Sequence, residues 1–544
     1  MSKDYSFNVM PSVSISRSRF ARKSQHKTSF NLGKIIPIYC DEVLPGDTRS
    51  LDMAALVRMT NPIAPIMDNI FLDIYAFFVP MRLTWDHWKD FMGENRESAG
   101  IPTRQYTIPV VAIGQGEDVD NGSYADYMGL PVGQGAGDIL SSNNISALPF
   151  RGLALIYNRW FRNENIIAPL AVQTGDTDEV LVGEYSSGDA PFVISANSVL
   201  KASKLSDYFT KALPYAQKGG AVSIPMGTTA PIITSSSLHN LGSGVVFAAA
   251  GSGAPSGPLA QDQGKLTINT SSGGFSTDIT KTSLVADLSN ATAATINQLR
   301  YAFQLQKLLE KDALYGTRYW EILAAHFGVQ APDASLQDPE YLGGHRININ
   351  IDQVLQTTGA TGTTGQTLGT PGANSVSGDK ASLFTKSFVE HGYIYILAVA
   401  RHESTYGQGI NRMWTRSGRY DFYFPVFANL GAQAILNKEI YAQGNSADNQ
   451  VFGYQEAWAE YRFKPSICTG LLRPSASGSL NYWTLAENFG SLPTLGQTFI
   501  EQNRGNINRA LVSTATDFIA DFYFQDIAVR PMPMYSIPGL IDHH

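Results

Sequence analysis

Few side chains in this chain stand at spacings that could perform chemistry. A phosphate-binding loop needs Ser or Thr after Gly-Lys, but Gly33-Lys34 and Gly264-Lys265 are followed by Ile and Leu. A zinc-binding helix needs a second His after His402-Glu403, and position 406 is Tyr. No serine stands in a Gly-x-Ser-x-Gly pattern. The motifs therefore predict no enzyme.

Metal ligands are equally sparse. The two cysteines, Cys40 and Cys468, are too far apart for a zinc knuckle and indicate reduced thiols. Asp118 to Gly122 resembles the start of a calcium loop, but position twelve is Gly129, where a bidentate Glu is required. We therefore expect a solvated turn there, and no metal ion or other cofactor.

The one functional electrostatic feature is the basic segment 1–34. It carries seven basic residues and one acid, whereas the whole chain has a net charge of −7. A solvated tail, a partner-pairing tail and a targeting signal are all compatible with this pattern. The alternative is contact with nucleic acid through the phosphates, without reading of sequence. The candidate residues are Arg17, Arg19, Arg22, Lys23 and Lys27.

The composition indicates a β-rich fold with many turns. Charged residues are only 16%, against about 25% in an average globular protein. Much of the surface is therefore expected to be buried against other subunits. No apolar run reaches the roughly 18 residues of a membrane span, and no secretory signal core is present, so we expect a protein assembled in the cytoplasm.

Periodicity places the main elements. Alternating or continuous apolar residues predict strands, and spacings of three and four predict helices. The predicted strands are 35–40, 69–79, 393–400, 420–428, 458–465 and 516–530. The predicted helices are a short one capped by Thr84, then 150–162, 206–212, 296–315 and one from Thr317 to Phe327.

Three stretches differ from this pattern. Residues 219–295 are rich in Gly, Ser and Thr and predict a large insertion with short strands, one at 265–270. Residues 357–378 predict a flexible surface loop. The tail 531–544 is rich in Pro and is expected to lie extended on a neighbouring subunit. The candidate subunit contacts there are Pro531, Pro533, Tyr535, Pro538 and Leu540.

Ordered motifs along almost the whole chain resemble the major capsid protein of the Microviridae, in particular the gokushovirus branch. The resemblance fades in the Gly/Ser-rich insertion. It rests on pieces that include Pro11-Ser-Val-Ser-Ile-Ser-Arg-Ser18, Asp41-Glu-Val-Leu-Pro-Gly-Asp-Thr48, Phe77-Phe-Val-Pro80, Asp207-Tyr-Phe-Thr210, Pro339-Glu-Tyr-Leu-Gly-Gly344, Asn411-Arg-Met-Trp414, Phe452-Gly-Tyr-Gln-Glu456 and Pro531-Met-Pro-Met-Tyr-Ser-Ile-Pro-Gly-Leu-Ile541.

This resemblance implies a mainly β fold, an eight-stranded viral jelly roll with long inserted loops and several helices. It implies pentamers that build a T=1 shell around circular single-stranded DNA, with the insertion as a three-fold protrusion that contacts the host. The implied partners are further copies of the chain, an internal scaffolding protein, a small basic DNA-binding protein, a pilot protein, the viral DNA and a host receptor. The location would be the virion.

On this interpretation the chain divides into five parts. They are a basic arm (1–34), the first part of the jelly roll with helical insertions (35–218), the insertion (219–295), a helical pair with the remaining jelly roll (296–530) and the tail (531–544).

Two other classes of protein remain open at this stage. The first is a carbohydrate-binding or adhesive β-sandwich, which would form monomers or small oligomers. The second is a β-rich polysaccharide hydrolase, which needs two carboxylates across a cleft, and the sequence singles out no pair.

Overall fold

The computed structural model describes residues 15–94, 105–112, 118–180, 195, 199–222, 232–234, 259–262, 265–268, 275–278, 284–286, 296–357, 368–502, 504–512 and 515–535. The chain forms two compact units, Met1–Ala216 with Asp312–His544, and Gln217–Lys311. The second unit contains the whole predicted insertion, 219–295. None of the described helices is long and apolar enough to cross a membrane.

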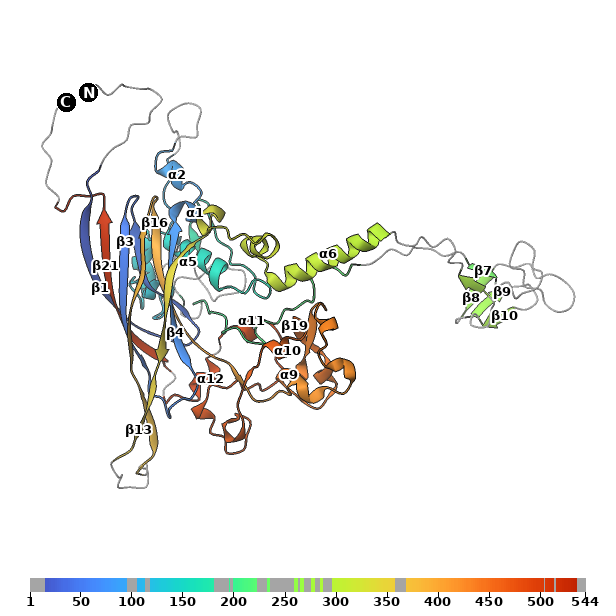
Figure 1. The fold of residues 1–544 in the computed structure, drawn as a ribbon. Helices are drawn as coiled ribbons and strands as arrows, with labels where there is room; N and C mark the ends of the chain where they lie inside the picture. The colour runs from blue at the N-terminus through green and yellow to red at the C-terminus, as the bar shows by residue number, and fades with distance from the viewer. Residues whose placement is uncertain are drawn as a thin grey trace, which may run out of the picture. The chain divides into compact units, whose positions relative to one another are not determined.

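Two four-stranded antiparallel sheets dominate the first unit (Figure 1). One has the order β1-β21-β3-β15, with bounds Ser18–Phe30, Phe518–Arg530, Thr48–Met59 and Ser377–Ser387. The other has the order β12-β4-β16-β2, with bounds Glu340–Ile349, Ile70–Pro80, Gly392–His402 and Ile35–Val43. This pairing of strands distant in sequence is consistent with a jelly-roll capsid fold. The described residues are mixed, with more strand than helix.

The sheet β12-β4-β16-β2 is buried on both faces at its centre. Nine consecutive residues of β16, Gly392–Ala400, are buried, because α1 (Met81–Thr84) and α5 (Leu148–Ile156) pack against this sheet. Phe77 of β4 contacts the Trp160 ring at 5.8 Å between centroids. The apolar character of both faces of 69–79 therefore has a direct cause.

The sheet β1-β21-β3-β15 is buried on one face only. Burial alternates strictly along β3 and along most of β21, so one face packs into the core. Phe518, Phe522 and Phe524 are buried there, and Phe30 stacks on Phe518. The opposite face keeps partly or fully exposed side chains and is called the outer face below.

Shorter elements surround the sheets in the first unit. Before the insertion these are α2 (Trp88–Phe91), β5 (Val111–Ala112), α3 (Tyr124–Tyr127), α4 (Ala136–Ser142), the π-helical turn η1 (Tyr157–Phe161) and β6 (Glu179–Val180). After it come α7 (Tyr319–Ile322), the π-helical turn η4 (Leu323–Phe327), α8 (Asp333–Leu336), and the hairpin β13 (Ile351–Leu355) with β14 (Pro371–Ser375).

A smaller hydrophobic core includes Tyr406, Ile440, Phe452 and Phe499, which lie between β16 and β21 in sequence, and Phe209, which comes from an earlier turn.

The elements between β16 and β21 in sequence are short. They are β17 (Thr405–Tyr406), β18 (Gln433–Leu436), α9 (Asn437–Ile440), β19 (Val451–Gln455), α10 (Ala459–Arg462), β20 (Ser466–Ile467), α11 (Gln497–Ile500) and α12 (Gly505–Asn508), with 3-10 turns η5 (Arg412–Thr415), η6 (Arg419–Asp421), η7 (Pro425–Phe427), η8 (Ser446–Asn449), η9 (Gly470–Leu472) and η10 (Asn481–Trp483).

In the second unit, β8 (Leu259–Asp262), β9 (Lys265–Ile268) and β10 (Phe275–Asp278) form a three-stranded sheet. β7 (Ile232–Thr234) pairs with β11 (Leu284–Ala286). The predicted strand at 265–270 is thus confirmed as β9. The helix α6 (Ile296–Tyr315) has the predicted bounds and continues past Lys311 into the first unit.

One predicted helix is wrong, and another is present with a different start. The short helix expected after Thr84 is α2 (Trp88–Phe91), but His87 and not Thr84 is its N-cap residue. Thr84 is the last residue of α1, and its hydroxyl donates to the Met81 carbonyl at 2.7 Å.

Residues 206–212 form turns. The Asp207 carboxylate accepts the backbone N–H groups of Phe209 and Thr210 as at the start of a helix, and the Lys211 N–H donates to the Asp207 carbonyl at 3.1 Å. The helix does not continue, because Leu213 pairs with Tyr454 and Pro214 follows.

Two predicted strands are also wrong. Residues 420–428 form the 3-10 turns η6 and η7, since Pro425 cannot donate in a strand. Residues 458–465 contain α10, which follows Trp458 with a left-handed backbone at φ 64°. The predicted loop 357–378 includes β14 and the start of β15, while 358–367 lie outside the described residues.

Two arginines of the predicted helix 150–162 are buried. Arg151 of α5 donates to the carbonyls of Thr84, Gly175 and Thr177. Arg159 is buried against Asp333 and Asp338. Long cationic side chains here satisfy interior acceptors.

Candidate nucleic-acid interface

Most of the candidate nucleic-acid contacts belong to β1. The segment 18–30 is an edge strand paired with β21 along its whole length. Successive side chains of a strand point to opposite faces. Arg19, Lys23 and Lys27 are exposed on the outer face, and Arg17 is exposed just before the strand. The sheet therefore holds three of these cations in one line.

Arg22 is different, because it points between the sheets. Its Nη2 donates to Asp41 Oδ1 at 3.0 Å, and its Nη1 lies 3.5 Å from Asp526 Oδ2. Burial by itself would raise the pKa of Asp41, but hydrogen bonds from Arg22 and Arg49 lower it overall. Arg22 is thus engaged in an internal ion-pair network.

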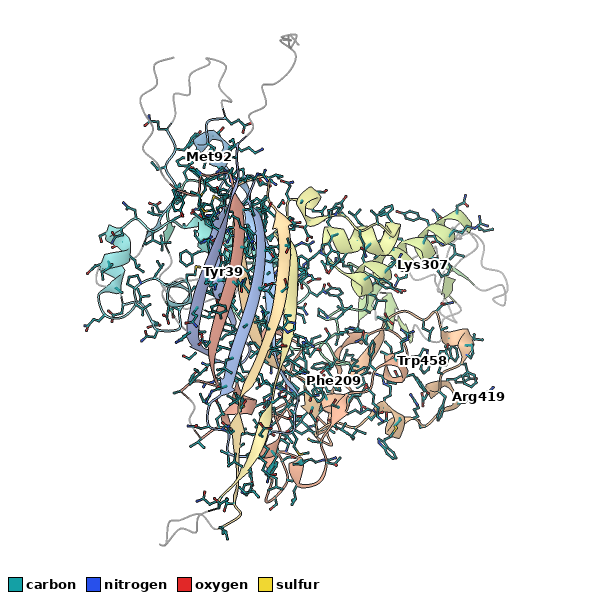
Figure 2. All side chains as sticks on the ribbon, turned by 60° about the vertical axis from the view of Figure 1, so that its left-hand side comes forward. Tyr39, Met92, Phe209, Lys307, Arg419 and Trp458 are labelled. Carbon is teal, nitrogen blue, oxygen red and sulfur yellow. The ribbon has the colours of Figure 1, made fainter. Side chains whose placement is uncertain are left out.

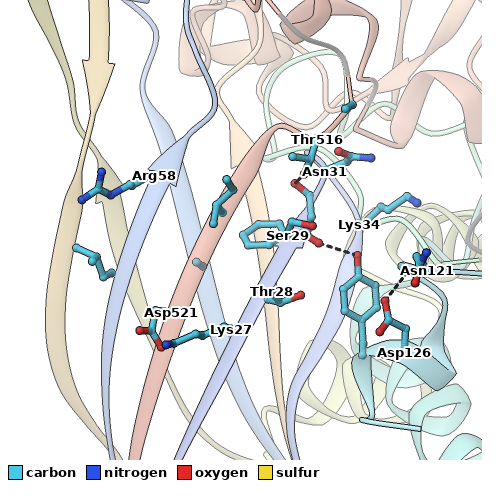
Figure 3. A pocket seen from close by; sticks show the side chains of 17 residues that line it. Lys27, Thr28, Ser29, Asn31, Lys34, Arg58, Asn121, Asp126, Thr516 and Asp521 are labelled. Carbon is cyan, nitrogen blue, oxygen red and sulfur yellow. Dashed lines mark hydrogen bonds between the residues drawn. The ribbon is translucent and has the colours of Figure 1, made fainter. Parts of the chain in front are cut away.

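One end of the outer face is hollowed into a groove of about 960 Å³ (Figure 3). Strands β1, β3 and β21 contribute to it together with α3 and the turn before α3. Three cations line the groove, and their side chains come from the sheet or from the turn after β1: Lys27, Arg58 and Lys34.

The groove also contains acids and hydrogen-bonding groups. Asp521 stands opposite Lys27 on the neighbouring strand, and Asp126 accepts the Gly122 N–H at 2.6 Å. The Tyr127 hydroxyl donates to the Ser29 carbonyl and fixes α3 against β1 (Figure 3). Hydroxyl and amide side chains of Thr28, Asn31 and Asn121 also line the groove, together with apolar side chains such as Leu56 and Ile519.

Lys34 lies among other charged side chains. Burial lowers the pKa of Lys34, the nearby charges of Lys201 and Arg504 lower it further, and the charge of Asp517 raises it. Lys201 lies 3.8 Å from Glu501, and Arg504 pairs with Asp517 at 2.8 Å, so both of these cations have acidic partners. Lys34 itself lines the groove together with Lys27 and Arg58.

Lys34 and Arg58 are not among the contacts predicted from the sequence. The alternation of Leu56, Val57, Arg58 and Met59 could have placed Arg58 on a solvent face, but only the strand order β1-β21-β3 puts it on the same outer face as Lys27. In the C-terminal candidates, Pro533 and Tyr535 are exposed and Pro531 is half-buried. Pro538 and Leu540 lie outside the described residues.

Among the described residues, no group of three His, Cys, Asp or Glu side chains could hold a metal ion. In the calcium-like loop, the Asp118 carboxylate accepts the Gly135 N–H at 3.0 Å. It therefore stabilises a turn.

Comparison with known proteins identifies the class. The sequence model of a family described as "Capsid protein (F protein)" matches residues 8–540. The chain is 42% identical to the capsid protein VP1 of Bdellovibrio phage phiMH2K, over 98% of this chain and 97% of the relative. It is 38% identical to the capsid protein VP1 of Chlamydia phage 1, at the same coverage. It is 37% identical to the capsid protein VP1 of Spiroplasma virus 4, over 95% and 94%.

These matches define a structural protein of the virion and not an enzyme. The chain belongs to the F/VP1 capsid protein family of the Microviridae, and its relatives are gokushovirus VP1 proteins. It is accordingly a capsid protein of small single-stranded DNA phages, and self-assembly follows from that role.

Proposed function

We propose that this chain folds as an eight-stranded viral jelly roll and assembles into a T=1 icosahedral shell around a circular single-stranded DNA genome. The observation that carries the proposal is the strand order. β1, β21, β3 and β15 lie in one sheet and β12, β4, β16 and β2 in the other, which is the double-sheet arrangement of jelly rolls.

The outer face of β1-β21-β3-β15 is the proposed DNA contact. Arg17, Arg19, Lys23 and Lys27 present their charges to solvent, and Arg58 and Lys34 extend the cationic groove. Arg22 is left out of this set because its guanidinium pairs with Asp41. Binding through these side chains would be directed at phosphates and tolerant of sequence.

The insertion 219–295 is the proposed surface protrusion, with host attachment as its role. Its separation as a compact unit, Gln217–Lys311, supports this proposal. The internal scaffolding protein, the small basic DNA-binding protein and the pilot protein are the proposed assembly partners, in the host cytoplasm.

Expression in bacteria tests the shell proposal, with and without the proteins encoded beside it. Electron microscopy of the purified protein should show closed isometric particles with knobs on the three-fold axes. Nuclease treatment should leave single-stranded DNA protected inside particles from infected cells. Only small oligomers under every condition would contradict the shell and favour an adhesive β-sandwich.

A further inference from the structure

An unusual concentration of apolar side chains lies on the surface around η5, η6 and η7. We call it the aromatic turn surface. Trp414 is 75% exposed, Tyr420 74% and Val426 88%. Its members are Met413, Trp414, Tyr420, Phe422, Tyr423, Val426, Leu430 and Tyr461, each about half exposed or more.

Local hydrogen bonds hold this surface in shape. The Asn411 side chain accepts the Met413 N–H at 3.0 Å and begins η5. The Asp421 carboxylate accepts the N–H groups of Ser417 and Gly418 at 2.9 and 2.7 Å. The Trp458 indole donates to the Phe427 carbonyl at 3.1 Å. A preformed apolar surface loses little entropy when a partner binds.

The surface lies away from the sheets. Figure 2 shows Arg419 at the edge of the molecule, with Trp458 nearby, whereas Tyr39 lies within the sheets. Tyr423 contacts both the Trp458 ring at 5.7 Å and the Tyr461 ring at 6.2 Å. The exposed rings are therefore the outer layer of a packed aromatic cluster.

The charges beneath the rings are paired. Arg416 donates to Glu460 at 3.1 Å and lies over the Tyr461 ring at 4.5 Å. Arg412 pairs with Glu439. These two guanidinium charges are balanced by buried carboxylates. Arg419 adds an exposed cation over the Phe424 ring at 5.7 Å, and Asp421 adds an exposed acid, so the surface carries little of the excess positive charge of a single-strand binding platform.

The area fits a protein interface. A buried aromatic residue covers about 150–250 Å², so eight half-exposed apolar side chains present on the order of 800 Å². That is about one partner's share of a standard interface. The largest apolar patch of a typical monomer is only about 300–600 Å². Trp, Tyr and Arg are also the residues that dominate binding energies.

We propose that the aromatic turn surface binds a second copy of this chain and forms a contact between subunits of the shell. The proposal rests on the assembly described above. A second copy is the occupant because a capsid protein assembles with further copies of itself. An apolar surface that is rigid and whose neighbouring charges are paired also suits a permanent contact.

The test compares two valines of equal exposure. Val426 lies on the surface, whereas Val389, also 88% exposed, lies in the turn between β15 and β16. A solvated Glu costs the free subunit little at either position, but a Glu in a dry contact blocks association. Val426→Glu should reduce the yield of particles at least tenfold, with the melting temperature of the unassembled subunit unchanged. Val389→Glu should assemble within twofold of the wild type.

The outcomes separate the two proposals. If the wild-type chain forms no shells, the proposed assembly itself fails. If the wild type assembles and Val426→Glu assembles equally well, the surface inference alone fails. Equal loss of particles in both variants would also overturn it, since the effect would not be specific. Trp414→Ser is assayed in parallel with a labelled single-stranded oligonucleotide, and loss of oligonucleotide binding with normal shells would make this a DNA surface instead.

Discussion

Arg49 shows how one buried cation joins the two sheets. Its side chain is fully buried in β3, and its Nε donates to Asp526 of β21 at 3.0 Å. A second nitrogen donates to the Tyr39 hydroxyl of β2 at 3.0 Å and to Asp41 at 2.6 Å. These hydrogen bonds of Arg49 therefore form only when β2, β3 and β21 each pair in the correct register.

Replacing Arg49 should lower the free energy of unfolding. In Arg49→Met, Asp526 remains buried without its main partner, and breaking a buried pair costs about 3–5 kcal/mol. Urea unfolding of the unassembled subunit should show this loss in the free energy of unfolding. Lys23→Met, an exposed cation of β1, should lose less than about 1 kcal/mol. Equal midpoints for both variants would refute a structural role for Arg49.

Asp73 gives the subunit a dependence on acid pH. Burial alone would raise the pKa of Asp73, but Arg346 and Arg401 outweigh this effect and lower it below its ordinary value of 3.8. Arg346 Nε lies 2.6 Å from Oδ1, and Arg401 Nε lies 3.0 Å from Oδ2.

The stabilisation from Asp73 is complete above the unfolded-state pKa of about 3.9 and disappears as the pH falls through the lower folded-state pKa. Thermal melts between about pH 7 and pH 3 should thus show falling stability below about pH 4. Asp73→Asn should be less stable at pH 7 and should show a shallower decline. A decline as steep as that of the wild type would assign the acid sensitivity to other groups.

At the scale of elements, β1 combines two roles for its charges. Exposed cations on an edge strand discourage pairing with another sheet. The same side chains can contact phosphates, and each such contact contributes about −0.7 to the slope of log affinity against log salt for a single strand.

The double variant Lys23→Gln/Lys27→Gln should therefore reduce the magnitude of that slope by about 1.4. Fluorescence anisotropy of a labelled oligonucleotide, titrated with unassembled subunits at several salt concentrations, measures it. Arg22→Gln is the control, since its guanidinium pairs with Asp41 and faces inward. A slope that changes with Arg22 but not with Lys23 and Lys27 would contradict the proposed face.

The C-terminal tail follows directly from β21. Met532, Met534 and Tyr535 are exposed immediately after the strand ends. We expect truncation from Met532 to lower the yield of particles while the melting temperature of the subunit stays within a few degrees. Normal shells from the truncated chain would exclude a contact role for the tail.

Some elements could be predicted from the sequence and others could not. β4, β16, β21 and α6 have long, unambiguous apolar patterns, and the structure confirms them. The segment 420–428 has equally strand-like residues, but its rings are exposed and its backbone turns at Asp421 and Pro425. Local composition cannot distinguish apolar residues that fill a core from those that remain on a surface. The groove similarly could not be predicted, because Lys27 and Arg58 share its lining only through the strand order β1-β21-β3, and Lys34 reaches it from the turn after β1.

At the scale of the whole molecule, the two compact units suggest separable tasks. The first unit contains both hydrophobic cores, and all eight strands of the two large sheets lie in it. The insertion 219–295 falls wholly within the second unit, between β4 and β12 in sequence. None of the described residues of either core lies in this segment.

Deletion of 219–295, with a short Gly/Ser linker in its place, should therefore leave a soluble subunit. Its melting temperature should stay close to that of the wild type, because the described residues of both hydrophobic cores lie outside the deleted segment and burial of apolar area dominates stability. Electron microscopy should show particles without knobs, and phage carrying the deletion should adsorb less to host cells. A matched deletion of 377–387, which removes β15 from its sheet, should yield insoluble protein. If the 219–295 deletion were equally insoluble, the insertion would be part of the folding core and the assignment as a protrusion would be wrong.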